Sequence, residues 1–205
     1  GAADGSLPRE ADVALFLELE CRKRGAESMG FETIAAGPSR SFGIHAFPAY
    51  TNAGFGGPGM SILDFGINVD GYTSDITMSF LRGNMNELQS EMISLVEEAY
   101  DLSVSMIKPG SGTSEIAKAV ETLFGNAGFE MPHALGHSIG LEVHESPALR
   151  PRPDSNVALE QGMIFAIEPG LYDQNAGGVR KENDFLVTDG GYEVLTNSRL
   201  IRLPG

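Results

Sequence analysis

The sequence has a single cysteine, Cys21, among its 205 residues. One thiol cannot form an internal disulfide, which excludes the disulfide-rich scaffolds typical of small secreted proteins. We expect Cys21 to be packed within a helix. We also expect the protein to work in a reducing compartment, the cytoplasm.

Basic residues are scarce as well: 14 Lys and Arg stand against 28 Asp and Glu, for a formal net charge of −14. Nucleic-acid binding needs a basic surface that releases counterions, so nucleic acid is not an expected partner. Anionic membranes attract basic segments, and no apolar run here approaches the roughly 18 residues of a spanning helix. The sequence therefore predicts no membrane partner.

The chain does have the composition of a globular domain, with 41% hydrophobic and 20% charged residues. Residue periodicity predicts three helices, at about 8–24, 86–107 and 113–126. Apolar runs bounded by Gly or Pro predict strands at 31–36, 163–172, 179–188 and 192–195. We expect one α+β domain that spans residues 1–205.

A weak internal repeat relates Gly5–Ile34 to Gly110–Phe129. Both segments contain Gly-Ser, a Glu five residues after that Gly, an amphipathic helix and a closing Gly. A long helix precedes the second copy, and nothing precedes the first. This asymmetry predicts two pseudo-symmetric αβ halves, the first short by one helix, in a chain trimmed at its N-terminus.

Two strands joined by Asp70-Gly71 form the most informative stretch, ILDFGINVDGYTSDITMSF. Asp-Gly between apolar runs is a strong hairpin signal because both turn residues must tolerate a positive φ. With this turn, Asp64 lies opposite Thr77, and Asp75 is a diagonal neighbour of Asp64 at a Cα separation of roughly 7–8 Å. Two interpretations of this stretch remain open: a cation between the aspartates, or a hairpin face in water where acids need no partner.

The histidines are unevenly distributed. His45 lies in the Gly- and Pro-rich stretch 37–59, which we expect to be a loop. The other three, His133, His137 and His144, lie within twelve positions and alternate with glycines. A lone histidine is more often structural than a ligand, but a cluster of three indicates a site.

Two glutamates, Glu168 and Glu182, lie in apolar strand-like runs where a charged side chain needs a partner. For Glu182 the simpler explanation is a local ion pair with Arg180, whereas Glu168 has no base nearby. The pooled candidates are four carboxylates and one imidazole: Asp64, Asp75, His137, Glu168 and Glu182. This set is too acidic for one divalent ion and suits two, of the type Mn²⁺, Co²⁺, Zn²⁺ or Fe²⁺.

The motifs that carry these residues resemble the metallopeptidases of the pita-bread fold, which include methionine aminopeptidase, Xaa-Pro aminopeptidase and prolidase. They are Asp64-x10-Asp75, HALGHSIGLEVHE, IEPGLY and VRKEND, and the resemblance runs from about Ser6 to Leu195. Arg180, two residues before Glu182, is typical of the Xaa-Pro aminopeptidase and prolidase branch. The resemblance implies a curved antiparallel sheet that holds the site, with helices outside.

The resemblance also implies which residues hold metal. Asp75 and Glu182 would bridge two divalent ions, for which Mn²⁺ is the first expectation. Asp64 would hold one ion, and His137 with Glu168 would hold the other.

Catalytic and substrate-side roles are implied in the same way. Glu168 would manage the proton of the bridging water, and His144 would contact the substrate carbonyl as the oxyanion develops. His45, His133 and Arg180 would lie on the substrate side, with His144. The implied reaction is hydrolysis of the peptide bond before proline by a metal-bridging hydroxide, in an Xaa-Pro dipeptide or at a peptide N-terminus.

Other functions stay open. The same fold could carry creatinase-like amidinohydrolase, lyase or methionine aminopeptidase chemistry, or the chain could be a non-catalytic peptide-binding module. Met78-Ser79 stands where the branch usually has Arg-Thr, and Lys181 stands where an aliphatic residue is usual. These departures concern substrate and rate more than metal binding. The branch usually has a further N-terminal domain that shapes the pocket, and the full-length protein would then form a homodimer.

Overall fold

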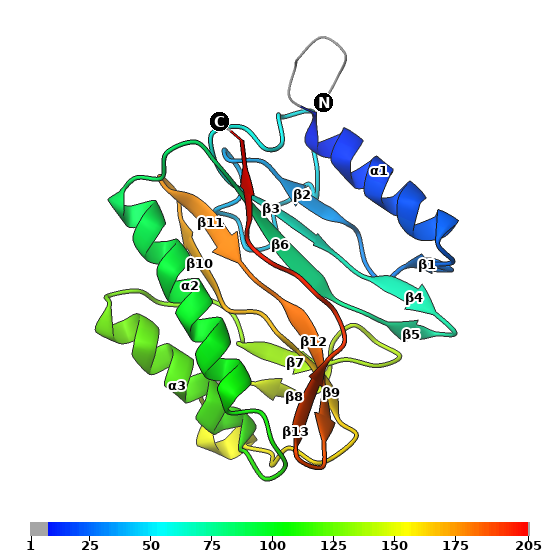
Figure 1. Cartoon of the computed structure of the whole chain (residues 1–205), viewed down its shortest axis with the longest axis vertical. Helices are drawn as coiled ribbons and strands as arrows, with labels where there is room; N and C mark the ends of the chain where they lie inside the picture. The colour runs from blue at the N-terminus through cyan, green and yellow to red at the C-terminus, as the bar shows by residue number, and fades with distance from the viewer. Residues whose placement is uncertain (1–7, 205) are drawn as a thin grey trace.

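The structure, a computed structural model, describes residues 8–204 and places its helices outside a twisted layer of strands (Figure 1). The helices are α1 (Glu10–Lys23), α2 (Glu87–Ser105) and α3 (Thr113–Asn126), with a 3-10 turn at Pro153–Ser155. The strands of the first half are β1 (Ser28–Met29), β2 (Ile34–Ala36), β3 (Gly59–Phe65), β4 (Ile67–Val69), β5 (Tyr72–Thr73) and β6 (Ile76–Arg82). The later strands are β7 (Gly136–Ser138), β8 (Glu145–Leu149), β9 (Ile164–Ile167), β10 (Gly170–Asp173), β11 (Gly177–Arg180), β12 (Asn183–Thr188), β13 (Gly191–Val194) and β14 (Ile201–Leu203).

The hairpin at Asp70-Gly71 forms as expected. Asp70 and Gly71 have φ of 51° and 81°, the positive values that a two-residue turn of this type requires. β3 and β6 pair antiparallel with Asp64 opposite Thr77, and β4 and β5 continue the two arms to the turn. The predicted register is therefore confirmed.

Two main sheets carry the fold. The first has the order β14-β6-β3-β2 and the second has the order β13-β12-β9-β7-β8. β14 runs parallel to β6, so the expectation of an antiparallel sheet is wrong at this edge. The chain after β13 returns along β6 instead of turning back beside β13 (Figure 1).

The strands predicted at 163–172 and 179–188 are each broken in two. The first splits into β9 and β10 around Glu168-Pro169, and the second splits into β11 and β12 around Lys181-Glu182. Pro169 has no backbone N–H to continue a ladder, which accounts for the first break. Both breaks fall at predicted metal ligands, so the backbone turns where these side chains must be aimed.

The helices divide unequally between the halves. α2 packs against α3, β10 and β11, whereas α1 packs against β2 (Figure 1). A large core lies between α2, α3 and the second sheet, and a smaller one lies beneath α1. On its outer face α1 exposes Leu15, Phe16 and Leu19, whose exposed fractions are 57%, 66% and 54%. Among the described residues every helix is too short or too polar to cross a membrane.

The predicted repeat is present, but in a different register. α1 begins at Glu10 and α3 at Thr113, and the closing glycines Gly25 and Gly128 both have positive φ. The two copies are thus displaced by 103 residues (10 to 113, 25 to 128), two fewer than the Gly-Ser match suggested. Strands β2, β3 and β6 correspond to β7, β9 and β12 in sheet order. Within residues 8–204 nothing in the first half corresponds to α2, as expected.

Candidate metal centre

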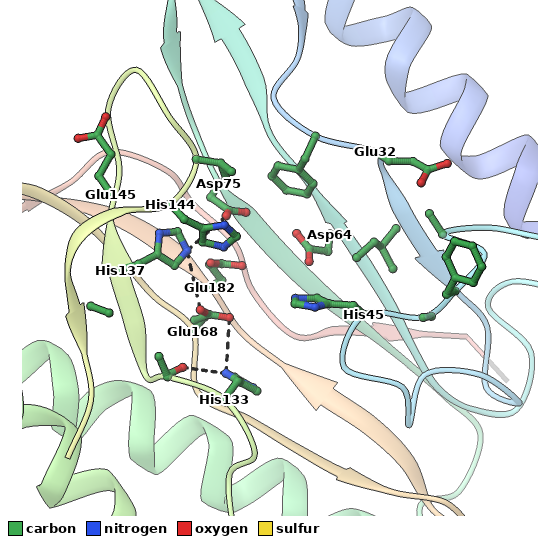
Figure 2. A pocket seen from close by; sticks show the side chains of 18 of the residues that line it. Glu32, His45, Asp64, Asp75, His133, His137, His144, Glu145, Glu168 and Glu182 are labelled. Carbon is green, nitrogen blue, oxygen red and sulfur yellow. Dashed lines mark hydrogen bonds and ion pairs between the residues drawn. The ribbon is translucent and has the colours of Figure 1, made fainter. Parts of the chain in front are cut away.

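The predicted ligands come together from both halves. They are Asp64 in β3, Asp75 just before β6, His137 in β7, Glu168 just after β9 and Glu182 just before β12. All of them line one cavity of about 600 Å³, and Figure 2 shows their side chains pointing toward one another. Four carboxylates and one imidazole that lie far apart in the sequence therefore meet in one cavity.

Three of these side chains are close enough to share an ion. Asp75, His137 and Glu182 each offer a ligand atom, and these atoms all lie within 4.8 Å of one another. His137 Nε2 lies 3.7 Å from Asp75 Oδ2 and 3.8 Å from Glu168 Oε1. These distances exceed a hydrogen bond, and they leave room for a bound atom between the groups.

The acids of the cluster are held in a low-dielectric environment. Burial raises the pKa of Asp75 and of Glu182 well above the ordinary range, and neighbouring carboxylates add to both shifts. Burial also raises the pKa of Glu168 to about 8. The same effect lowers the pKa of His137 to about 4, so its imidazole is neutral at pH 7, the form that binds metal.

Unsatisfied oxygens give an independent test of metal binding. Asp64 Oδ1 and Asp75 Oδ1 are buried and have no hydrogen-bond partner among the described residues. Leaving such acceptors unpaired is costly, and native proteins rarely do so without an ion, a water molecule or a functional reason. The donor set of carboxylates and one imidazole suits hard or borderline divalent cations. The residues present therefore fit a metal centre.

Comparison with known proteins decides the family. Residues 5–189 match metallopeptidase family M24. The chain belongs to metallopeptidase family M24. It is 36% identical to an uncharacterized peptidase, YqhT, of Bacillus subtilis, over 92% of this chain and 53% of that protein. It is 34% identical to a Xaa-Pro dipeptidase of Pyrococcus furiosus, over 93% of this chain and 54% of that protein.

Solved structures of M24 proteins have the same fold. The prolidase from Pyrococcus horikoshii OT3 superposes with a TM-score of 0.89 at 33% identity, over 95% of this chain and 56% of that one. An X-Pro aminopeptidase from Thermotoga maritima MSB8 gives 0.87 at 30% identity, over 98% and 56%. The predicted pita-bread fold and Xaa-Pro branch are confirmed. The chain spans about half the length of the curated relatives it matches.

Arg180 does not line the cavity of this M24 site, contrary to its expected place on the substrate side. It is 1% exposed, and its Nη2 donates to Asp64 Oδ2 at 2.5 Å. Its Nε donates to Thr77 Oγ1 at 3.0 Å, and its Nη1 donates to Tyr172 Oη at 2.7 Å. The simpler explanation of Glu182, an ion pair with Arg180, is not observed among the described residues, because the guanidinium of Arg180 pairs with Asp64 of β3 instead. Arg180 thus holds a candidate ligand and is not part of the cavity wall.

The four histidines surround the M24 cluster as predicted. His45, His133, His137 and His144 all line the cavity (Figure 2). The rings of His144 and His137 meet edge to face with centroids 4.3 Å apart. His133 Nε2 lies 3.0 Å from Tyr172 Oη, and burial lowers the pKa of His133 to about 4. Because Tyr172 accepts from Arg180, it can donate to a neutral His133.

Three further residues, to which the sequence assigned no role, hold side chains or backbone of the site in place. Thr77 Oγ1 donates to Glu182 Oε2 at 2.6 Å, and Asp184 Oδ2 accepts from the backbone N–H of Asp75 at 2.9 Å. Tyr172 is the third, between His133 and Arg180. Thr77 was placed opposite Asp64 by the hairpin register, a signal that could have identified it. Asp184 and Asp75 are 109 positions apart, and Tyr172 and His133 are 39 apart, so no local pattern identifies these two contacts.

Proposed function

We propose that this chain carries a dinuclear metal centre and hydrolyses the peptide bond that precedes proline. The observation that supports the proposal is the convergence of five side chains on one cavity, where two buried aspartate oxygens lack partners. Four carboxylates balance the charge of two divalent ions. One ion alone would leave repulsion between buried acids uncompensated.

Each side chain has a place in this proposal. Asp75 and Glu182 would contact both ions, Asp64 would hold one, and His137 with Glu168 would hold the other. Mn²⁺ is the first expectation, and Co²⁺, Zn²⁺ and Fe²⁺ are alternatives. When bound, the ions would supply Lewis acidity and lower the pKa of a water molecule.

The residues of the chain would bind the substrate and move its protons. Glu168 would take a proton from the attacking water on a carboxylate oxygen and pass it to the leaving amine. His144 would donate to the oxygen of the scissile carbonyl as negative charge develops there. His45 and His133 would contact the substrate from the cavity wall, which contains both rings.

Part of the cavity wall suits a proline ring. The apolar residues that line the cavity are Phe31, Ile34, Ala46, Phe47, Ala49, Ala134, Val143 and Ala148. The amide before proline has no N–H, so an enzyme must recognise it by shape instead of by accepting a hydrogen bond. The relative from Pyrococcus furiosus is named a Xaa-Pro dipeptidase, which supports the same specificity.

A second feature favours dipeptides over longer peptides. Arg150 lines the cavity, and among the described residues no acid forms an ion pair with it. A guanidinium is well suited to bind a free carboxylate. The C-terminal carboxylate of an Xaa-Pro dipeptide would lie next to the scissile bond, whereas a longer peptide has an amide there.

The test is hydrolysis of Ala-Pro, Ala-Pro-Ala and Ala-Ala by the chain with added Mn²⁺. We expect turnover of Ala-Pro, less of Ala-Pro-Ala and none of Ala-Ala. Arg150→Ala should raise KM for Ala-Pro about tenfold, which corresponds to 1.4 kcal/mol. Arg152→Ala is the matched control, because Arg152 is exposed and does not line the cavity. Two equivalents of bound metal without turnover of either proline peptide would reject the proposed reaction. A homodimer of the full-length protein and a cytoplasmic location stay predictions.

A further inference from the structure

Glu10, the first residue of α1, is a fully buried carboxylate far from the metal ligands in sequence. Its Oε1 accepts from the backbone N–H of Gly37 at 2.7 Å. Its Oε2 accepts from the backbone N–H of Thr51 at 2.8 Å, from Thr51 Oγ1 at 2.6 Å and from Arg40 Nη1. All of these groups donate hydrogen bonds, so the side chain at position 10 must offer an acceptor at both of its terminal atoms.

These bonds close a loop that forms one wall of the cavity. Gly37 and Thr51 are joined at a single carboxylate, and Arg40 Nη2 donates to the carbonyl of Pro48 inside the loop. Between these points lie four residues that line the cavity: His45, Ala46, Phe47 and Ala49. Phe47 is 92% exposed, so packing against the protein cannot fix it. Polar contacts therefore hold this part of the wall, at the base of the loop through Glu10 and next to His45 through Arg180, whose Nη1 donates to the carbonyl of Ile44 at 3.1 Å.

The equivalent position in the other half uses neutral groups. Thr113 begins α3 as Glu10 begins α1, and its Oγ1 accepts from the backbone N–H of Val157 at 3.0 Å. The backbone bridges are equivalent too, because Arg9 pairs with Gly54 and Gly112 pairs with Ala158. Both helix starts thus bind the loop that precedes the central strand of their sheet.

The two loops differ in what they border. In the second half this loop contributes only Arg150, directly after β8, and none of residues 151–158 that Thr113 binds, whereas segment 37–51 of the first half contributes His45 and three neighbours. A buried ion pair contributes little net stability, because the cost of desolvating both charges offsets much of their attraction. A charged, multiply bonded carboxylate is instead suited to fix a single geometry. The charged version occurs in the half whose helix-bound segment, 37–51, lines the cavity.

We infer that Glu10, together with Arg40, is a positioning residue that fixes the His45 loop as a substrate-binding wall. Glu10 touches neither substrate nor metal ligands and acts through the loop. The inference rests on the proposed function for its kinetic consequence only, since the contacts themselves do not depend on any reaction.

The first arm of the test measures amide hydrogen exchange and needs no activity. Glu10→Gln keeps the size of the side chain but turns an NH₂ group toward groups that are themselves donors. We expect faster exchange in residues 38–52 by at least tenfold, with unchanged exchange in α2 and α3. Thr113→Ala is the matched control, and it should accelerate exchange in residues 151–158 but not in 38–52. Equal exchange in 38–52 for the two variants would overturn the inference.

The second arm measures kinetics on Ala-Pro in a double-mutant cycle with His45. Glu10→Gln should raise KM about tenfold with bound metal unchanged, and Thr113→Ala should leave KM unchanged. In a His45→Ala background, Glu10→Gln should change KM by about twofold at most, because both changes act at one wall. The same tenfold effect in both backgrounds would overturn the inference.

A second variant keeps the test decisive if Glu10→Gln does not fold. Arg40→Gln leaves Glu10 bonded to Gly37 and Thr51, so it should shift exchange and KM in the same direction by a smaller factor. No change in either measurement would count against the inference. If the unaltered chain cleaves no Xaa-Pro peptide, the proposed function fails, and the exchange experiment still decides the role of Glu10.

Discussion

The two halves of the molecule have the same strand order but differ in their helices. In the second half α3 is covered by α2, and its Phe124 is buried in the larger core. In the first half α1 covers the sheet alone and exposes Leu15, Phe16 and Leu19. The smaller core of the first half contains far less apolar surface to hold the sheet in place. The first half therefore depends on the second half for part of its support.

That dependence is visible at the site, where ligands of each half are held by residues of the other. Arg180 of the second half binds Asp64, and Asp184 binds the backbone N–H of Asp75. In return Thr77 of the first half donates to Glu182. The cluster of candidate ligands thus depends on the docking of the two halves, because Asp64, Asp75 and Glu182 are each held by a residue of the other half.

Removing a charge where the halves meet should have the largest effect. Asp75→Asn and Glu182→Gln keep the shape of the side chain but remove negative charge that we propose two cations share. We expect each variant to lose at least one metal and to lose about 10³-fold or more in kcat/KM. Metal analysis of the purified proteins and hydrolysis of Ala-Pro check both effects. Full metal content and normal turnover in Glu182→Gln would contradict the dinuclear proposal.

Two histidines of the second half should separate metal binding from catalysis. His137→Ala removes the single imidazole of the ligand set, so metal affinity should fall. His144→Ala should retain metal and lower kcat by roughly 10²–10³-fold, because a donor aimed at developing charge acts mainly in the transition state. Titration with Mn²⁺ and steady-state kinetics measure the two effects separately. Loss of metal in His144→Ala with retention in His137→Ala would reverse the assignment.

The hairpin shows how much of the site could be predicted from sequence. The Asp70-Gly71 turn determines the register, and the register places Asp64 opposite Thr77 in the observed structure. Local rules suffice here because a two-residue turn allows only one register between the two strands that it joins. The ligands of the second half were found from their motifs, since charged residues in apolar runs need a partner.

Contacts between the halves could not be predicted in this way. Arg180 lies two residues from Glu182, yet its partner is Asp64, 116 positions away. The backbone turns between β11 and β12, so the alternation that would place Arg180 beside Glu182 does not hold. The parallel pairing of β14 with β6 depends equally on the path of a distant segment. Sequence periodicity predicts individual helices and strands, whereas the Arg180–Asp64 pair and the β14–β6 pairing depend on how those helices and strands pack together.

The larger core should dominate stability. Phe124 is 1% exposed in α3, and Phe124→Ala should lower the free energy of unfolding by about 3–5 kcal/mol, as is usual when a large core side chain is removed. Urea denaturation with an unchanged m-value would measure the loss. A cost below about 1 kcal/mol would show that the second half does not provide the main support.

The pH dependence of the metal-free protein tests the acid cluster. Burial raises the pKa of Glu168 to about 8 and that of Asp184 to about 7, so the folded state keeps protons that the unfolded state has released. Stability should therefore fall as pH rises from about 6.5 to 8.5, by an amount on the order of 1–2 kcal/mol for Glu168. His133 and His137, with pKa lowered to about 4, are neutral in the folded state but still partly protonated in the unfolded chain near pH 6.5, so they oppose the trend at the lower end of this window and not above about pH 7.5.

Thermal unfolding with chelator and with saturating Mn²⁺ measures this effect. Chelated protein should lose stability across the window, whereas Mn²⁺ should raise the midpoint and remove the slope, because the ion binds the native state and replaces the protons. Glu168→Gln supplies the control, since its amide does not titrate. Identical midpoints with and without chelator at pH 8 would contradict convergence of the acids on a shared cation.

The smallest effect is expected on the outer face of α1. Phe16 is 66% exposed, so Phe16→Ala removes little buried surface, and alanine has the better helix propensity. We expect a change in unfolding free energy within about 0.5 kcal/mol, against the several kcal/mol expected for Phe124→Ala. The two helices can be compared directly because each substitution removes a phenylalanine ring. A loss above about 1 kcal/mol in Phe16→Ala, dependent on protein concentration, would show that this face is covered in solution by a second copy. The contrast between a covered α3 and an uncovered α1 would then be wrong.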